Sequence, residues 1–159
     1  MTSPFKISWN IEVIDQNALD NEVDYTIFMR TAITGTARVA MGSQSVDIRK
    51  CGLLQLSNAM IYLSVMPLLY IPNAREIFLT EAVDMTSVLI HDRIQLSLQS
   101  SQYQTTTVFD IDPLEALAEV GRFHAALVQL LYAANNLYRT DSRVREYLSF
   151  ASVNFLKPR

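Results

Sequence analysis

Cys51 is the only cysteine in this chain of 159 residues. It follows Arg49 and Lys50 and lies near a predicted helix start, two features that lower a thiol pKa and favour the nucleophilic thiolate. A cysteine nucleophile also needs a base, and nothing in the spacing brings His91 or His124, the two histidines, towards it. We therefore predict that Cys51 is structural and reacts slowly with thiol reagents in the native protein. A lone cysteine also excludes a disulfide framework and a cysteine-rich zinc module.

His124 lies between Val120 and Leu127, on the apolar stripe of a predicted helix. A metal site there would need further ligands at helical spacing, but the helix offers only Glu119 and no His-x-x-x-His or Glu-x-x-His pair. We expect a core or border histidine that bonds to a backbone group. His91 ends an apolar strand, and we expect it to be solvated near a turn.

Paired carboxylates can hydrolyse glycosides or hold a divalent cation. The chain has two clusters of them, which are Glu76, Glu81, Asp84 and Asp92, and then Asp110, Asp112 and Glu115. The second cluster lacks the glycine-containing loop of an EF-hand, and helix capping explains Asp112 and Glu115. The sequence therefore predicts no metal site.

Other catalytic signatures are missing from the sequence. It contains no G-x-S-x-G, no H-E-x-x-H and no glycine-rich phosphate loop, since the chain has only four glycines. We expect no cofactor, and the sequence favours a protein that is not an enzyme.

The secondary-structure elements that must position these residues are indicated by two kinds of apolar spacing, the alternation typical of strands and the spacing of three to four residues typical of helices. Eight segments are rich in alternating or β-branched residues and predict strands: 5–13, 23–33, 37–41, 45–48, 76–81, 87–91, 93–99 and 102–109. Three segments have helical spacing: 49–66, 112–138 and 144–151. This order predicts a single α+β domain over residues 1–159, in which a mostly antiparallel sheet packs against two main helices and a short C-terminal helix. The predicted core contains Trp9, Ile11, Leu54, Ile61, Leu96, Leu98, Leu117, Phe123, Leu127 and Leu131.

Several local signals refine these elements. Asp112, Pro113 and Glu115 are typical of a helix start. Thr34-Gly35-Thr36 suits a tight turn, whereas Gly121 suits close packing of a helix against its neighbours.

Residues 51–74 contain no charge, which raises the question of a membrane span. Their amides, serines and two prolines favour a helix buried in the domain core instead. We therefore expect no membrane association. The N-terminus also lacks a secretory signal pattern, which favours a cytoplasmic protein.

Charge is segregated although the net charge is only −3. Residues 1–28 carry five acids and one lysine, whereas residues 122–159 carry six basic and two acidic groups. Such patches steer complementary protein partners, while one short arginine cluster in an acidic protein argues against nucleic acid. The favoured contact is an acidic surface built from residues 15–24 and 81–92, whose charged members are Asp20, Glu22, Asp24, Glu81, Asp84 and Asp92. The alternative contact is the cluster Arg139, Arg143 and Arg145.

The order of strands, buried helix, strands and helices, without a catalytic motif, resembles small bacterial immunity-type proteins. That resemblance implies a non-enzymatic domain that binds and neutralises a toxin. Two alternative functions stay open for the same predicted strands and helices. The domain could bind a small molecule, or act as a minor enzyme, through a pocket between sheet and helices. It could also be a structural subunit that assembles through edge strands, in which case a homo-oligomer is expected.

Overall fold

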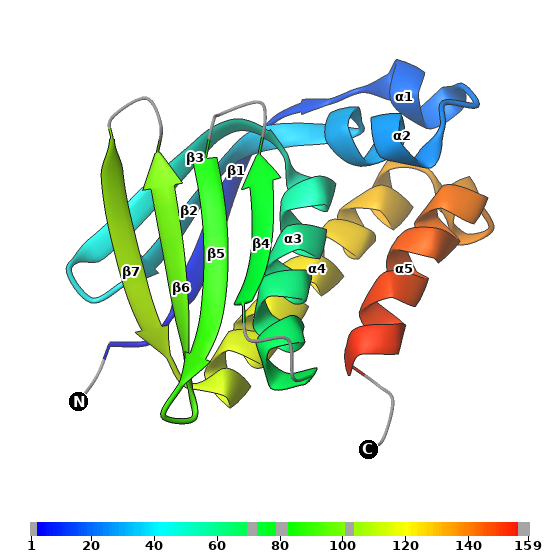
Figure 1. The fold of residues 1–159 in the computed structure, drawn as a ribbon. Helices are drawn as coiled ribbons and strands as arrows, with labels where there is room; N and C mark the ends of the chain where they lie inside the picture. Colours follow the sequence, from blue (N-terminus) through cyan, green and yellow to red (C-terminus); the bar gives the residue numbers. More distant parts are fainter. Residues whose placement is uncertain (1–2, 70–72, 79–82, 101–103, 156–159) are drawn as a thin grey trace.

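Two antiparallel sheets form the frame of the protein in a computed structural model that describes residues 3–69, 73–78, 83–100 and 104–155 (Figure 1). Sheet A has the strand order β1-β2-β3 and contains β1 (Lys6–Ile14), β2 (Ile33–Met41) and β3 (Gln44–Gly52). Sheet B has the order β4-β5-β6-β7 and contains β4 (Asn73–Phe78), β5 (Val83–Ile90), β6 (Arg93–Ser100) and β7 (Thr105–Ile111). Within each sheet, every strand therefore pairs with its neighbour in the chain.

Helices pack beside and between these sheets (Figure 1). They are α1 (Gln16–Asp20), α2 (Tyr25–Thr31), α3 (Leu53–Val65), α4 (Pro113–Ala134) and α5 (Ser142–Phe155), with 3₁₀ turns η1 (Met66–Leu69) and η2 (Asn136–Arg139). The predicted α+β class and its antiparallel pairing are confirmed, although the strands divide into two sheets instead of one.

The buried helix predicted over 49–66 is confirmed as α3, which is covered on nearly all sides. It begins at Leu53 and not at Arg49, because Ile48 and Cys51 still pair with β2. Among the described residues, no helix has both the length and the apolar character needed to cross a membrane.

Seven of the ten predicted core residues are buried. They are Leu54, Ile61, Leu96, Leu98, Phe123, Leu127 and Leu131. Trp9, Ile11 and Leu117 are half-buried and pack against the same core. The Trp9 ring lies 4.9 Å from the Phe123 ring, so β1 and α4 meet through aromatic side chains.

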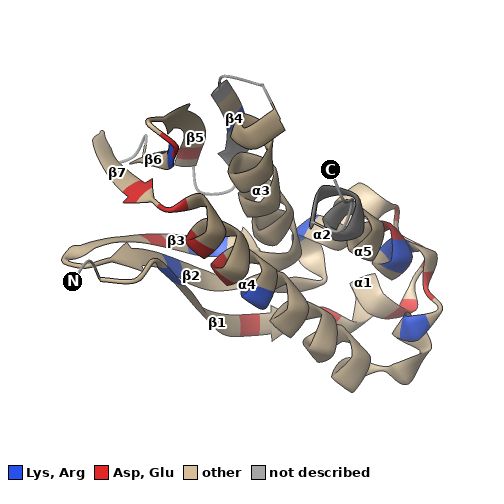
Figure 2. Cartoon of the chain, turned by 90° about the horizontal axis from the view of Figure 1, so that it is seen from below, with Lys and Arg blue, Asp and Glu red and all other residues tan. Residues whose placement is uncertain are grey.

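Helix α4 runs alongside β1 and closes part of its free edge (Figure 2). The Asp112 carboxylate caps the helix as predicted, since it accepts hydrogen bonds from the next backbone N–H groups. Glu115 serves differently from the predicted capping role, because its carboxylate accepts the backbone N–H of Phe5. One turn later the Glu119 carboxylate accepts the N–H of Ile7 at 2.8 Å. We call this contact the β1–α4 seam.

The strand predicted over 23–33 was wrong, because residues 25–31 form α2 and only Ile33, where β2 begins, lies in a strand. Its residues have strand propensity, but the Asp24 carboxylate accepts the N–H of Ile27 at 2.9 Å and so starts a helix. Phe28 and Met29 then pack into the core, and this tertiary burial outweighs local preference. Residues 16–20, which lie outside the predicted strands and helices, form a short helix, α1, which Asp15 caps.

Two glycines differ from expectation. Gly35 lies within β2 and not in a turn, and a Cβ atom there would be 2.1 Å from the carbonyl oxygen of Asn10. The residue is therefore needed for close approach of β1 and β2. A Cβ atom added at Gly121 would meet no neighbouring element within 4 Å in the described part of the chain, so the expected close packing is absent.

Candidate binding groove

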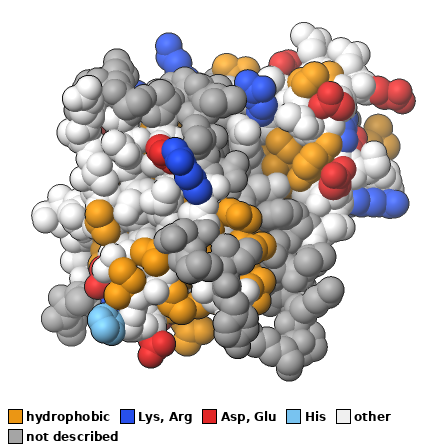
Figure 3. All heavy atoms as spheres, viewed as in Figure 1, with side chains coloured by type: hydrophobic (Ala, Val, Ile, Leu, Met, Phe, Trp, Pro, Cys, Tyr) orange, Lys and Arg blue, Asp and Glu red, His pale blue; other side chains and the backbone are white. Residues whose placement is uncertain are grey.

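A groove of about 360 Å³ lies where the N-terminal helices meet the segment between α4 and α5. One wall consists of Leu19, Asp20, Asn21 and Glu22, and the other of Asn135, Leu137, Tyr138, Thr140, Asp141 and Arg143. We call it the corner groove. Acidic, basic and hydrophobic side chains all lie at this end of the surface (Figure 3).

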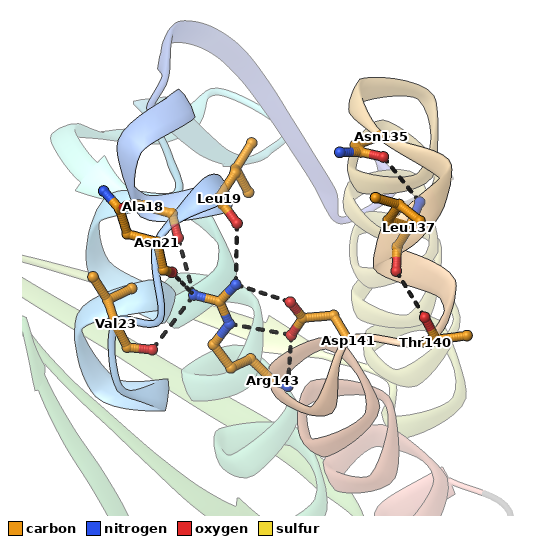
Figure 4. Close-up of polar contacts among 9 residues, drawn as sticks. All are labelled: Ala18, Leu19, Asn21, Val23, Asn135, Leu137, Thr140, Asp141 and Arg143. Atoms are coloured by element: carbon orange, nitrogen blue, oxygen red, sulfur yellow. Dashed lines mark hydrogen bonds and ion pairs between the residues drawn. The ribbon is translucent and has the colours of Figure 1, made fainter.

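Side-chain caps shape both walls. On the first wall, Asp15 accepts the N–H of Asn17 at 2.9 Å and starts α1, which ends at Asp20. On the second wall, Asn135 accepts the N–H of Leu137 at 2.9 Å, and Thr140 donates to the Leu137 carbonyl at 3.1 Å (Figure 4). These bonds end α4 and form η2, because Asn and Thr side chains satisfy backbone groups that the helix leaves free.

Arg143 joins the two walls (Figure 4). Its guanidinium donates to four backbone carbonyl oxygens of the first wall and its flank, those of Ala18, Leu19, Asn21 and Val23, at 2.9–3.4 Å. It also donates to the Asp141 carboxylate, with a shortest distance of 2.8 Å, and lies 4.5 Å from the centre of the Phe28 ring. The side chain is only 13% exposed.

These contacts make Arg143 a structural residue. They occupy its donors, and the hydrogen bonds from Arg143 hold the pKa of the Asp141 carboxyl below its usual value, although burial acts in the opposite direction. Arg143, the central residue of the alternative contact cluster Arg139, Arg143 and Arg145, is therefore bonded within the protein and is not available to a partner.

Tyr138 differs from Arg143 because its buried side-chain hydroxyl forms no hydrogen bond within the described residues. The residue is 3% exposed, and its hydroxyl has no partner among the residues that the structure describes. Burial raises its pKa to about 12, and the negative charge of Asp20 acts in the same direction. Tyr138 lines the groove together with Asp20, Asp141 and Arg143, and the charges of these three residues act on its buried hydroxyl. An unsatisfied buried hydroxyl costs about 1–3 kcal/mol.

Leu137 precedes Tyr138 and lies at the rim of the groove. The residue is 74% exposed, so its side chain is available as an apolar contact at the rim. The groove therefore offers an apolar contact, an unsatisfied hydroxyl and carboxylates within one concave surface.

The structure places the predicted acidic residues in different roles. Asp20 and Glu22 are exposed and line the corner groove. Asp24 is exposed as well, but its carboxylate caps α2. Two of the three N-terminal acids are thus free for a partner, and the third stabilises a helix.

The acids of the second predicted segment lie elsewhere. Asp84 pairs with Arg75 at 2.6 Å across β4 and β5, and Asp92 lies in the β5–β6 turn with a φ of 61°. Glu81 lies outside the described residues. In Figure 1 the β5–β6 turn is at the bottom of the molecule, whereas α1 and α2 are at the top right. The two segments therefore form separate surfaces.

The candidate catalytic residues are buried or isolated from one another. Cys51 is fully buried in β3, with its sulfur 3.6 Å from the carbonyl oxygens of Gly35 and Ile48. His124 is 5% exposed and stacks on Tyr147 with 4.0 Å between ring centres. Its Nε2 has no hydrogen-bond partner in the described part of the chain, and burial lowers its pKa to about 4.

No group of three or more metal-ligating side chains forms among the described residues. His91, which is exposed in the β5–β6 turn, joins no candidate site within those residues. Comparison with protein-family models, with curated proteins and with solved structures finds no match to the chain. Its function is therefore inferred from its own residues.

The sequence predicted Asp20 and Glu22 as contact residues, and Arg143 as part of the alternative contact, but not the other residues of the opposite wall. Leu137 and Tyr138 lie at the end of the helix predicted over 112–138, where the sequence pattern does not distinguish them from the other residues of its apolar face. The capping residues Asn135 and Thr140 were the available signal that the helix ends early. That the segment then faces α1 depends on tertiary contacts of Arg143.

Proposed function

We propose that this chain is a non-enzymatic protein-binding domain whose corner groove receives a basic side chain of its partner. The observation that carries the proposal is the buried Tyr138 hydroxyl, which has no partner among the described residues and belongs to a residue that lines a groove together with Asp20, Glu22 and Asp141. A role as an immunity-type protein that neutralises a toxin is the specific form of this proposal, and it rests on the resemblance in element order.

The charges of the groove favour a cation. Asp20 and Glu22 form no ion pair within the described residues, whereas Arg143 is paired with Asp141. The balance of the four groups is two negative charges. A Lys or Arg side chain can lay its apolar stem on Leu137 and bring its charged end to Asp20 and Glu22. An N–H of that group can also bond to the phenolic oxygen of Tyr138, which accepts as well as donates.

Such recognition affects the association rate more than the affinity. Complementary charges steer the encounter, and salt screens them over about 8–10 Å. We therefore expect association to slow as ionic strength rises.

The test compares three immobilised proteins: the wild type, the groove variant Asp20→Lys/Glu22→Lys, and the control Asp92→Lys. Each is exposed to extract from the cells that produce the protein, and captured proteins are identified by mass spectrometry. We expect a partner that the wild type and the control retain and the groove variant loses. The purified partner should then associate more slowly with the groove variant and at higher salt. Equal capture by all three proteins would refute the groove as the contact.

Assembly through edge strands has weaker support. β1 is an edge of sheet A, but Glu115 and Glu119 bond to its N–H groups at Phe5 and Ile7. An edge whose donors are already occupied cannot pair with another strand there.

A further inference from the structure

A second pocket lies between α2 and α3 and shares no lining residue with the corner groove. Its volume is about 280 Å³, and it is lined by Tyr25, Thr26, Met29, Gln55, Asn58, Ala59 and Tyr62. We call it the α2–α3 pocket. It lies between two helices and not between sheet and helices, where a small-molecule site was expected.

The lining chemistry selects an uncharged ligand. None of the seven residues is acidic or basic. Two aromatic rings, from Tyr25 and Tyr62, offer flat surfaces for stacking, and Met29 and Ala59 supply apolar contact. Pockets with apolar walls and a few placed polar groups are the common form of small-molecule site.

Asn58 supplies the placed polar group. Its Nδ2 donates to the Tyr25 hydroxyl at 3.1 Å, while its Oδ1 is buried with no hydrogen-bond partner among the described residues. A side-chain amide has two N–H donors, so one N–H and the carbonyl oxygen are left. Loss of water without a replacement donor makes this oxygen a costly group in the folded protein. Because Asn58 Oδ1 is buried, the amide has to turn about its last side-chain torsion, which is soft in Asn, for this edge to reach a ligand in the pocket.

The Tyr25 hydroxyl adds a donor beside that edge. It accepts the hydrogen bond from Asn58, which leaves its own O–H free to donate. Burial raises the pKa of Tyr25, so the hydroxyl keeps its proton at neutral pH.

We propose that the α2–α3 pocket binds a neutral, planar molecule through a carboxamide or ring-amide edge. The ligand N–H groups bond to Asn58 Oδ1, and the ligand carbonyl accepts from Asn58 or Tyr25. The ring lies against Tyr25 and Tyr62. At about 280 Å³, the pocket lies just below the roughly 300–1,000 Å³ that is usual for ligand sites, so it suits a small ligand of one or two rings.

The test titrates the isotope-labelled full chain with three small probes by NMR. Benzamide is planar and neutral with an intact amide edge. N,N-dimethylbenzamide has lost its N–H groups, and benzoate carries a charge. We expect benzamide to shift resonances of residues 25–29 and 55–62, and to bind about threefold to tenfold more tightly than N,N-dimethylbenzamide, as the loss of one hydrogen bond predicts. Benzoate should bind more weakly still.

Variants locate the contact. Asn58→Ala should weaken benzamide binding about threefold to tenfold. The matched control Asn10→Ala, which removes an exposed amide from the outer face of sheet A, should leave it unchanged. No benzamide shifts at these residues, or equal affinity for the three probes, would overturn the proposal. That comparison uses the wild-type protein, so it stands even if Asn58→Ala does not fold.

Discussion

At both the β1–α4 seam and the corner groove, a C-terminal helix is joined to the N-terminal part of the chain, but the two regions differ in whether their buried polar groups are satisfied. In both, charged side chains of a later helix bond to the backbone of an N-terminal segment: Glu115 and Glu119 bond to β1, and Arg143 bonds to the end of α1. At the seam, Phe5 and Ile7 are buried and their N–H groups are satisfied. At the corner, the donors of Arg143 are satisfied, but the hydroxyl of Tyr138 has no partner within the described residues, and a groove stays open.

Whether a buried polar group is hydrogen-bonded therefore distinguishes residues that stabilise the fold from residues that can bind a partner. Glu119 illustrates the first kind. Burial acts to raise the pKa of its carboxyl, but hydrogen bonds from Arg122 and from the Ile7 N–H outweigh that effect and lower it. The ionised carboxylate is therefore retained as part of the structure. Tyr138 illustrates the second kind, since nothing in the described chain compensates the burial of its hydroxyl.

The largest expected effect is on Arg143. Arg143→Ala leaves the Asp141 carboxylate and several carbonyl oxygens without their donor, and we expect a loss of about 3–5 kcal/mol in the free energy of unfolding. Arg143→Lys should lose less, because an ammonium keeps the charge but cannot reproduce the planar set of donors. Urea denaturation followed by circular dichroism measures both.

Arg145→Ala is the matched control for this prediction, since Arg145 is exposed on the same helix. We expect a change within about 0.5 kcal/mol. If Arg143→Ala is equally mild, the corner is not held by this side chain, and the distinction between the two regions fails.

The next effect tests His124, a second buried side chain, whose Nε2 has no hydrogen-bond partner among the described residues. Its pKa is about 4 in the folded protein, against about 6.5 for an unperturbed histidine. Between these values the unfolded chain binds a proton and the folded protein does not. Stability should therefore be complete above about pH 6.5 and fall as the pH drops towards 4, by up to roughly 3 kcal/mol.

Unfolding measured at a series of pH values checks this slope. His124→Phe, which keeps a ring beside Tyr147, should flatten the profile in that window. His91→Asn, a change in the exposed turn, should preserve the wild-type slope. A wild-type stability that does not change between pH 6.5 and pH 4 would contradict the burial of a neutral His124.

The seam and the groove also differ in how far the sequence predicts them. The α4 start was predictable because Asp112, Pro113 and Glu115 are adjacent, and their capping pattern is local. That Glu115 bonds to Phe5 was not, since 110 positions separate the two residues. Local signals thus locate helix ends, whereas tertiary contacts decide what the helix side chains bind.

Helix α2, which was predicted as a strand, also shows that local sequence signals do not predict the effect of tertiary contacts. Residues 25–31 have the composition of a strand, and only the Asp24 cap signals a helix. At the groove, acidic composition identified Asp20 and Glu22, but composition alone did not distinguish them from Asp24. Whether a carboxylate is free or bonded to its own backbone depends on local φ and ψ, which similar residue types do not reveal.

Asp24 therefore provides a smaller test that divides the acidic wall. Asp24→Ala removes the cap of α2, and we expect it to cost about 1 kcal/mol of stability. Asp20→Ala should change stability by less than about 0.5 kcal/mol, because its side chain is exposed. Thermal unfolding distinguishes the two variants. If partner association slows with Asp20→Ala and stability falls with Asp24→Ala, the acids have separate roles, whereas equal effects on both measurements would remove that division.

The smallest effect is expected within the seam and has the opposite sign. Gly121 lies mid-helix between Glu119 and Arg122, and a Cβ atom there meets no neighbouring element of the described chain within 4 Å. A glycine in a helix interior costs up to about 1 kcal/mol relative to alanine, mainly because it loses more backbone freedom on folding. Gly121→Ala should therefore raise the free energy of unfolding by about 0.5–1 kcal/mol. Gly35→Ala should destabilise the protein instead, because a Cβ there meets the backbone of β1. A destabilised Gly121→Ala would show that the seam depends on the helix backbone as well as on its charged side chains.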